Sequence, residues 1–95
     1  MDSEFADLIP LFVEESRDRV ERLTTVVPRL LADREARIEA KRELHTLKGA
    51  GRMMRLGPFA ELCHAAEELL STPAETPLQP SAVPLLLRVA DRLSL

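Results

Sequence analysis

The chain has 95 residues, of which 45% are apolar and 31% charged, and its net charge is −3. This length supports one hydrophobic core, so residues 1–95 are expected to form a single domain with no second lobe for a nucleotide. The acidic balance argues against nucleic acid as a partner, and the lack of a run of about 18 apolar residues argues against membrane insertion.

The first predicted element is a long amphipathic helix whose apolar residues stay on one face for about seven turns. These residues are Phe5, Leu8, Ile9, Phe12, Val20, Leu23, Val26, Val27 and Leu30. Asp2, Ser3 and Asp7 are candidate caps, and Pro10 suits a first turn. The regular helix is therefore expected to begin near Asp7.

Pro28 interrupts this pattern near its end. Proline removes one backbone hydrogen bond and clashes with the preceding turn. Because Leu30 and Leu31 keep the apolar phase beyond it, we expect a kinked continuation of the helix. Residues 32–34 are predicted to form a short turn before the next helix.

The second predicted helix spans about residues 34–55 and carries the candidate site. Its apolar sector consists of Ala36, Ala40, Leu44, Leu47, Ala50, Gly51 and Met54. His45, Lys48, Gly49 and Arg52 fall on the other side, stacked on one stripe by their spacing. Gly49 costs a helix about 1 kcal/mol relative to alanine, and core packing cannot offset this cost on an exposed stripe. A large partner is therefore expected to approach His45 there.

Two further residues of this helix do not follow the simple pattern. Glu43 falls inside the apolar sector, which either a rim position or a partner such as Arg17 or Arg37 would reconcile. Ile38 lies on the His45 side, where core packing at the helix margin is favoured over a role in docking.

A third helix is predicted to begin after Gly57 and Pro58 stop the second, and to run to about Ser71. Its expected buried residues are Phe59, Leu62, Ala66, Leu69 and Leu70. His64 and Glu67 lie one turn apart off this face, and Glu67 is nearer the rim from which it could reach the second helix.

Residues 72–80 contain three prolines and are predicted to form a loop. Ser81 is the expected cap of a fourth helix with Pro84 in its first turn. The predicted buried stripe of that helix is Ala82, Leu85, Leu86, Val89 and Leu93. Four amphipathic helices with short connections predict an all-α fold, packed as an antiparallel up-down four-helix bundle.

The motif His45-Thr46-Leu47-Lys48-Gly49 resembles the His-x-x-Lys-Gly signature of histidine phosphotransfer (HPt) domains. Residues 50–57 are similar to the chemotaxis-kinase branch of that family, and His64-Ala65-Ala66-Glu67 adds a matching segment of the third helix. The resemblance covers nearly the whole chain. It implies the amino-terminal phosphoacceptor domain of a chemotaxis-type sensor kinase, a signalling module excised from a longer protein.

The residues on the stripe suit this chemistry. Neutral imidazole is a good nucleophile near neutral pH, so His45 is the expected phosphoacceptor. The Glu67 carboxylate would hold the His45 Nδ1 proton and leave Nε2 free to attack. Lys48 would offset charge on the phosphoryl oxygens, and Gly49 would make room for the partner. The resemblance further implies that His64 joins this network, and Arg52 is a candidate assistant of Lys48.

The predicted function is to accept a phosphoryl group from an ATP-dependent histidine kinase catalytic domain and to pass it to an aspartate of a response-regulator receiver domain. The module would need no cofactor, no metal and no ATP site of its own, and is expected to be monomeric. Its single cysteine, Cys63, fits a reducing, cytoplasmic compartment. The alternative is a phospho-incompetent docking bundle. A hydrolase using His45, Glu67 and Cys63 is disfavoured because Cys63 falls at the core margin.

Overall fold

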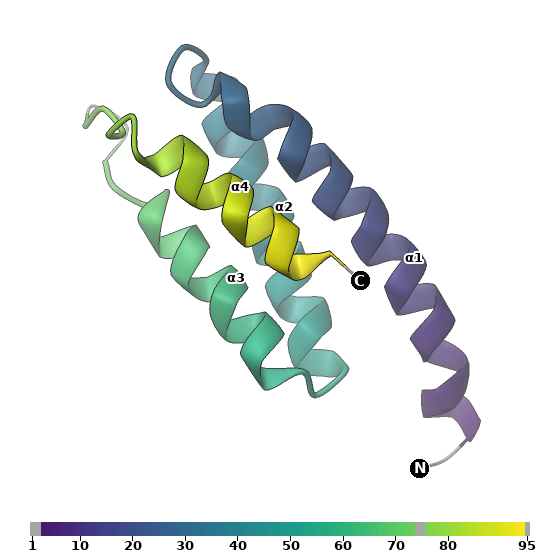
Figure 1. Cartoon of the computed structure of the whole chain (residues 1–95). Helices are drawn as coiled ribbons and strands as arrows, with labels where there is room; N and C mark the ends of the chain where they lie inside the picture. The colour runs from purple at the N-terminus through teal and green to yellow at the C-terminus, as the bar shows by residue number, and fades with distance from the viewer. Residues whose placement is uncertain (1–2, 74–75, 95) are drawn as a thin grey trace.

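The computed structural model describes residues 3–73 and 76–94, and these residues form four helices (Figure 1). They are α1 (Ser3–Val26), α2 (Arg34–Met53), α3 (Gly57–Leu69) and α4 (Ala82–Leu93), with a 3-10 turn, η1 (Val27–Arg29), after α1. The predicted all-α, antiparallel four-helix bundle is confirmed. None of the helices in the described part of the chain is long and apolar enough to cross a membrane.

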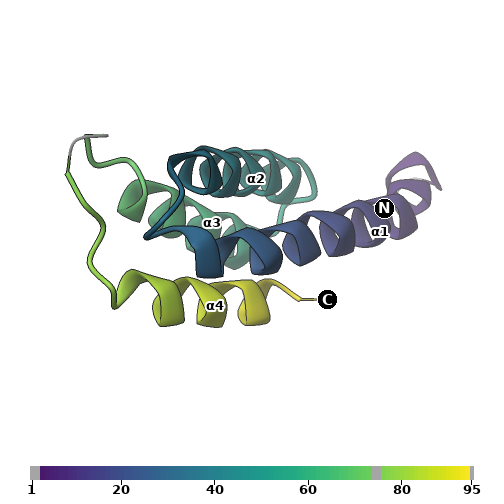
Figure 2. The ribbon, with the colours of Figure 1, turned by 90° about the horizontal axis from the view of Figure 1, so that it is seen from above.

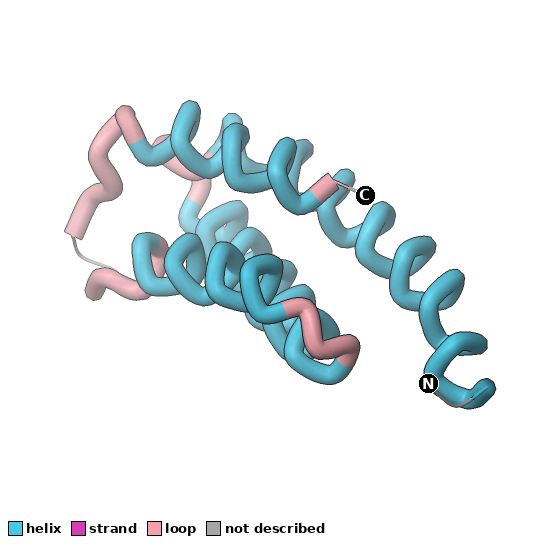
Figure 3. The backbone as a smooth tube through the Cα atoms, turned by 60° about the horizontal axis from the view of Figure 1, so that its bottom comes forward, coloured by secondary structure: helices cyan, strands magenta, loops and turns pink. Residues whose placement is uncertain are grey.

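The helices are arranged so that α2 and α4 lie on opposite sides of the bundle, with α1 and α3 between them (Figure 2). Accordingly, α1 and α3 each pack against both α2 and α4. The connection from α3 to α4 is the longest loop (Figure 3). Side chains from all four helices and from Leu70, which directly follows α3, fill the interior with almost no solvent exposure, among them Leu23, Leu44, Leu47, Cys63, Leu70, Leu86 and Leu93.

The two prolines of the first helix behave differently from expectation. The helix begins at Ser3, ahead of Asp7, so Pro10 lies inside it. Pro10 is exposed, and the carbonyl that loses its bond there can be hydrated. The expected kinked continuation at Pro28 is wrong, because the α-helix ends at Val26 and Pro28 sits in the tighter η1 turn. The candidate cap Asp2 lies outside the described residues.

The amino-terminal half of α1 extends past the end of α4 (Figure 1). Ser94, just beyond α4, lies beside Val20 of α1, which leaves the preceding turns of α1 uncovered on that side. As a result Leu8 and Ile9, which were expected to be buried, are 42% and 40% exposed. Phe12 packs edge-on against Phe59 of α3, with ring centroids 5.6 Å apart.

The reversal from α2 to α3 uses Arg55, not Gly57, in the left-handed conformation, with a φ of 61°. Arg55 N–H donates to the Arg52 carbonyl (3.1 Å) and Leu56 N–H to the Gly51 carbonyl (2.8 Å). These two bonds form the Schellman closure of a helix, in which glycine usually holds the left-handed position. Gly57 instead begins α3, followed by Pro58.

Three expectations for the carboxyl-terminal part also differ from the structure. The α3 helix ends at Leu69, before Ser71, and the Ser81 side chain makes no capping hydrogen bond to α4. Leu85 is 47% exposed, while Ala90 is buried in its place. The helical face that points inward is therefore centred on Leu86, because α4 must contact α1 and α3 at once.

The left-handed Arg55 generates a stability prediction. Arg55→Gly should raise the free energy of unfolding by about 0.5–1 kcal/mol, because glycine adopts this conformation without a Cβ clash. Urea denaturation followed by circular dichroism measures it. The control Arg52→Gly, inside α2, should lower the stability by about 1 kcal/mol. A destabilised Arg55→Gly variant would contradict the assignment.

Candidate functional site

The candidate site is built around the Glu67 carboxylate of α3, which contacts two side chains of α2. Its Oε2 lies 2.8 Å from Nδ1 of His45, and its Oε1 accepts a hydrogen bond from Nζ of Lys48 at 2.5 Å. His45 and Lys48 are one helical turn apart, so both can reach the same carboxylate. The distance from Glu67 to His45 lies within the range that a tautomer-fixing role requires.

The three side chains differ sharply in exposure. The His45 side chain is 69% exposed, whereas Glu67 and Lys48 are 14% and 13% exposed. With Nδ1 facing Glu67, Nε2 is the ring nitrogen left free for a reagent. Glu67 and Lys48 thus form a solvent-shielded ion pair that supports an accessible imidazole.

The pKa of the Glu67 carboxyl lies below its ordinary value. Desolvation acts to raise this pKa, but the hydrogen bonds from Lys48 and His45 and the charges of these two side chains together outweigh desolvation. The carboxylate therefore stays ionised at neutral pH. An ionised acceptor holds a proton on Nδ1 and stabilises positive charge on the ring.

Gly49 and Arg52 share the exposed face of α2 with His45. A Cβ added at Gly49 would meet no atom within 4 Å, so nothing inside the domain requires glycine there. By contrast, a Cβ at Gly51 would lie 2.6 Å from Cδ1 of Phe59, and that glycine serves the packing of α2 on α3. Arg52 makes no ion pair with any residue that the structure describes.

His64 is paired within its own helix and not with the His45 cluster. Its Nε2 lies 3.2 Å from Oε1 of Glu68, and both side chains are exposed. The structure therefore brings together His45, Lys48 and Glu67 but leaves His64 outside this hydrogen-bond network.

Cys63 is unsuited to act as a nucleophile. It is fully buried, and burial, followed by the nearby Glu67 charge, raises the pKa of its thiol to about 11. The thiolate that a cysteine hydrolase needs is absent at neutral pH. Cys63 was expected at the core margin but lies inside the core, and a hydrolase that uses this thiol is disfavoured for that reason as well.

The sequence reasoning missed two features near the site. Glu43 is buried and pairs with Arg19 of α1 (3.2 Å), and not with Arg17 or Arg37. Lys41 and Arg42 line a hollow beside His45. Their positions, four and three residues before His45, are the signal that could have identified them.

The chain is similar to a known protein family and to a known protein. A family model described as "Hpt domain" matches residues 7–94. The "Gliding motility regulatory protein" of Myxococcus xanthus is 37% identical over 91 residues, which are 92% of this chain and 12% of that protein. The chain thus spans about one eighth of the length of this relative. No solved structure matches significantly.

The contact between His45 and Glu67 makes the imidazole tautomer measurable. Long-range ¹H–¹⁵N NMR at about pH 8 should show His45 with its proton on Nδ1, because an ionised carboxylate accepts from that nitrogen. Glu67→Ala should remove this preference. His64 in the same spectrum is the internal control and should not change. A His45 spectrum that is identical with and without Glu67 would contradict the proposed acceptor.

Proposed function

Because the chain belongs to the Hpt domain family and is a histidine phosphotransfer module of a phosphorelay, we propose that His45 is the residue that carries the phosphoryl group. The observation that supports this most strongly is the exposed His45 ring, held at Nδ1 by Glu67 with Nε2 free. We further propose the chemotaxis-type sensor kinase as the parent protein, a cytoplasmic location, and a kinase domain and a receiver domain as partners.

In the first step, the Nε2 lone pair attacks the γ-phosphorus of ATP held by the kinase domain. The bond from phosphorus to the bridging oxygen breaks, and ADP leaves with the electron pair. The proton on Nδ1 stays in place, so the ring gains positive charge as the new bond forms. Glu67 stabilises that charge at 2.8 Å.

In the second step, a carboxylate oxygen of the receiver's aspartate attacks the phosphorus. The bond from phosphorus to Nε2 breaks, and its electron pair returns to the ring, which becomes neutral again. Lys48 contributes to both transfer steps through Glu67, because its 2.5 Å hydrogen bond fixes the orientation of the Glu67 carboxylate. Lys48 could also offset charge on the phosphoryl oxygens. For this, its ammonium would leave the Glu67 carboxylate and form a hydrogen bond to the phosphoryl group.

His45→Gln tests the carrier role. Labelled phosphoramidate supplies a phosphoryl group without a kinase: its bond to nitrogen breaks, ammonia leaves, and a bond to imidazole forms. Wild type should take up one acid-labile, alkali-stable group from it, and likewise from ATP with a chemotaxis-type kinase domain. It should then pass the group to a receiver domain. His45→Gln should abolish uptake with little change in thermal unfolding, because exposed substitutions alter stability by at most about 0.5 kcal/mol.

His64→Gln is the matched control and should still be labelled, since His64 pairs with Glu68 and makes no hydrogen-bond contact with the cluster of His45, Lys48 and Glu67. Lys48→Ala should slow transfer without abolishing it. If His45→Gln is labelled, or wild type is not, His45 is not the acceptor. The docking-bundle alternative is favoured if wild type stays unlabelled.

Gly49→Ala separates stability from recognition. The new Cβ meets no atom of the domain, so the variant should be about 1 kcal/mol more stable. It should nevertheless transfer more slowly to and from partner proteins, while uptake from phosphoramidate stays unchanged. Gly57→Ala, whose Cβ is equally unobstructed, is the control. Equal transfer rates for the two variants would show that Gly49 does not make room for a partner.

A further inference from the structure

Glu67 lies in the last turn of α3, where a helix runs out of its own hydrogen-bond donors. Leu70 caps this helix with a φ of −89°, so the end lacks the left-handed closure that Arg55 gives to α2. Glu67 and Glu68 place two negative charges at this end, and the last turn contains no basic residue, which the helix dipole disfavours. The position of Glu67 therefore depends on contacts that other elements make with the end of α3.

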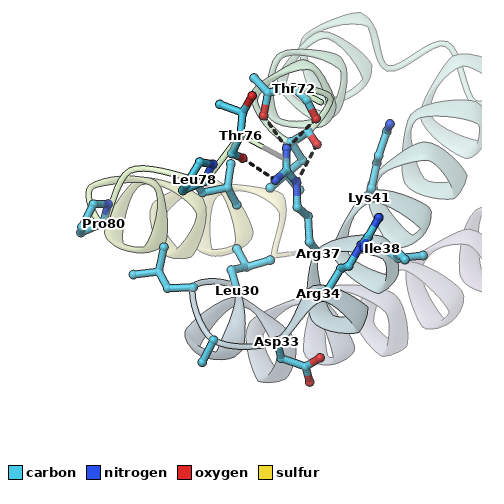
Figure 4. Close-up of a pocket in the computed structure, with 14 residues that line it drawn as sticks. Leu30, Asp33, Arg34, Arg37, Ile38, Lys41, Thr72, Thr76, Leu78 and Pro80 are labelled. Atoms are coloured by element: carbon cyan, nitrogen blue, oxygen red, sulfur yellow. Dashed lines mark hydrogen bonds between the residues drawn. The ribbon is translucent and has the colours of Figure 1, made fainter. Parts of the chain in front are cut away.

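Arg37 of α2 supplies such contacts. Its guanidinium donates to the carbonyls of Leu70 (3.2 Å), Thr72 (2.6 Å) and Thr76 (3.1 Å), and also to the Thr72 hydroxyl (Figure 4). All these acceptors are uncharged, and Arg37 forms no ion pair with any residue in the described part of the chain. It thus brings a positive charge and several donors in a rigid fork to a helix end that has no basic residue of its own.

Apolar packing does not do the same work at this end of the seam. A hollow of about 600 Å³ lies between α2 and the α3–α4 connection (Figure 4). Ile38, for which core packing was expected, lines this hollow and is 43% exposed. Leu70 is buried in the core, but an apolar contact is non-directional and does not orient the carbonyl group of the same residue. The hydrogen bonds of Arg37 supply the directional link between α2 and the residues that follow α3.

The seam between α2 and α3 is thus fixed on both sides of Glu67. On one side, Phe59 packs against Gly51 of α2. On the other side, Leu70 accepts from Arg37. Glu67 is three residues from Leu70 but eight from Phe59, so the arginine is the nearer support. A displacement of this last turn would lengthen the 2.8 Å contact between Glu67 and the imidazole.

We propose that Arg37 is a positioning residue for the reaction of His45, because it holds the end of α3 against α2 and thereby keeps the Glu67 carboxylate at Nδ1. The inference rests on the proposed function. The hydrogen bonds of Arg37 go to residues 70–76, so its influence on His45 runs through the position of the carboxylate. Its loss is therefore expected to slow the chemistry of His45 without moving the site of labelling.

Three measurements compare wild type with Arg37→Gln, which removes the fork. Hydrogen exchange of the Leu70 and Ser71 amides, bonded to α3 carbonyls, should quicken at least about tenfold relative to that of Leu86 in α4. Long-range ¹H–¹⁵N NMR at about pH 8 should show the His45 proton shared between Nδ1 and Nε2. Labelling by phosphoramidate should slow about threefold to tenfold. Arg37→Lys, which keeps the charge on one ammonium, should give intermediate values.

A double-mutant cycle separates positioning from general stability. If Arg37 acts through Glu67, adding Arg37→Gln to Glu67→Ala should change the labelling rate by less than about 1.5-fold. Val89→Ala, in the core side of α4, is the control for lost stability. It should lower the unfolding temperature but leave the His45 tautomer and the labelling rate unchanged. Arg34→Gln makes the same change in net charge at the start of α2 and should behave as wild type in all three measurements.

The outcomes are distinct. If Arg37→Gln keeps the wild-type tautomer and labelling rate, or slows labelling equally with and without Glu67, Arg37 is not a positioning residue. If Val89→Ala shifts the tautomer as Arg37→Gln does, the effect is general loosening and the inference fails. Should Arg37→Gln not fold, wild-type values for Arg37→Lys overturn the inference and intermediate values support it. If phosphoramidate does not label wild type, the proposed function fails, whereas the exchange and tautomer measurements still report whether Arg37 positions Glu67.

Discussion

Close packing of α2 on α3 is the constraint on which the site depends. At the crossing, Gly51 faces Phe59 and Ala60, and the small residues Ala40, Cys63 and Ala66 are buried. Small side chains let two helices approach closely, and only then can a side chain as short as glutamate reach across to its partner. Larger residues along this seam would move Glu67 away from His45 without touching either residue.

The site needs a hydrogen-bond acceptor that is shielded from solvent and an imidazole that is exposed to it, and two layers of side chains meet these two requirements separately. The lower layer, Glu67 with Lys48, is shielded from solvent, which strengthens its hydrogen bonds and fixes its geometry. The upper layer is the imidazole alone, which under the proposed function is met by two different partner proteins in turn. On that proposal, the partners supply the walls around the imidazole during each reaction.

Much of this could be predicted from the sequence because the information is local. Helical periodicity located all four helices, and the spacing of His45, Lys48 and Gly49 placed them on one face. What failed depends on long-range geometry. The exposure of Leu8 follows from where α4 ends, and the partner of Glu43 follows from the register of α1 against α2. Arg55 holds the left-handed position although a glycine stands two residues later, so residue preference alone misplaced that turn.

The buried thiol has a practical consequence. Cys63 is the only cysteine, and as an inert, protonated group inside the core it will resist maleimide and methanethiosulfonate reagents in the folded state. The wild-type chain therefore gives no labelling of its own in a site-directed labelling experiment. A cysteine introduced at any exposed position would carry a spin label or fluorophore alone, without first altering the helix seam that holds Glu67.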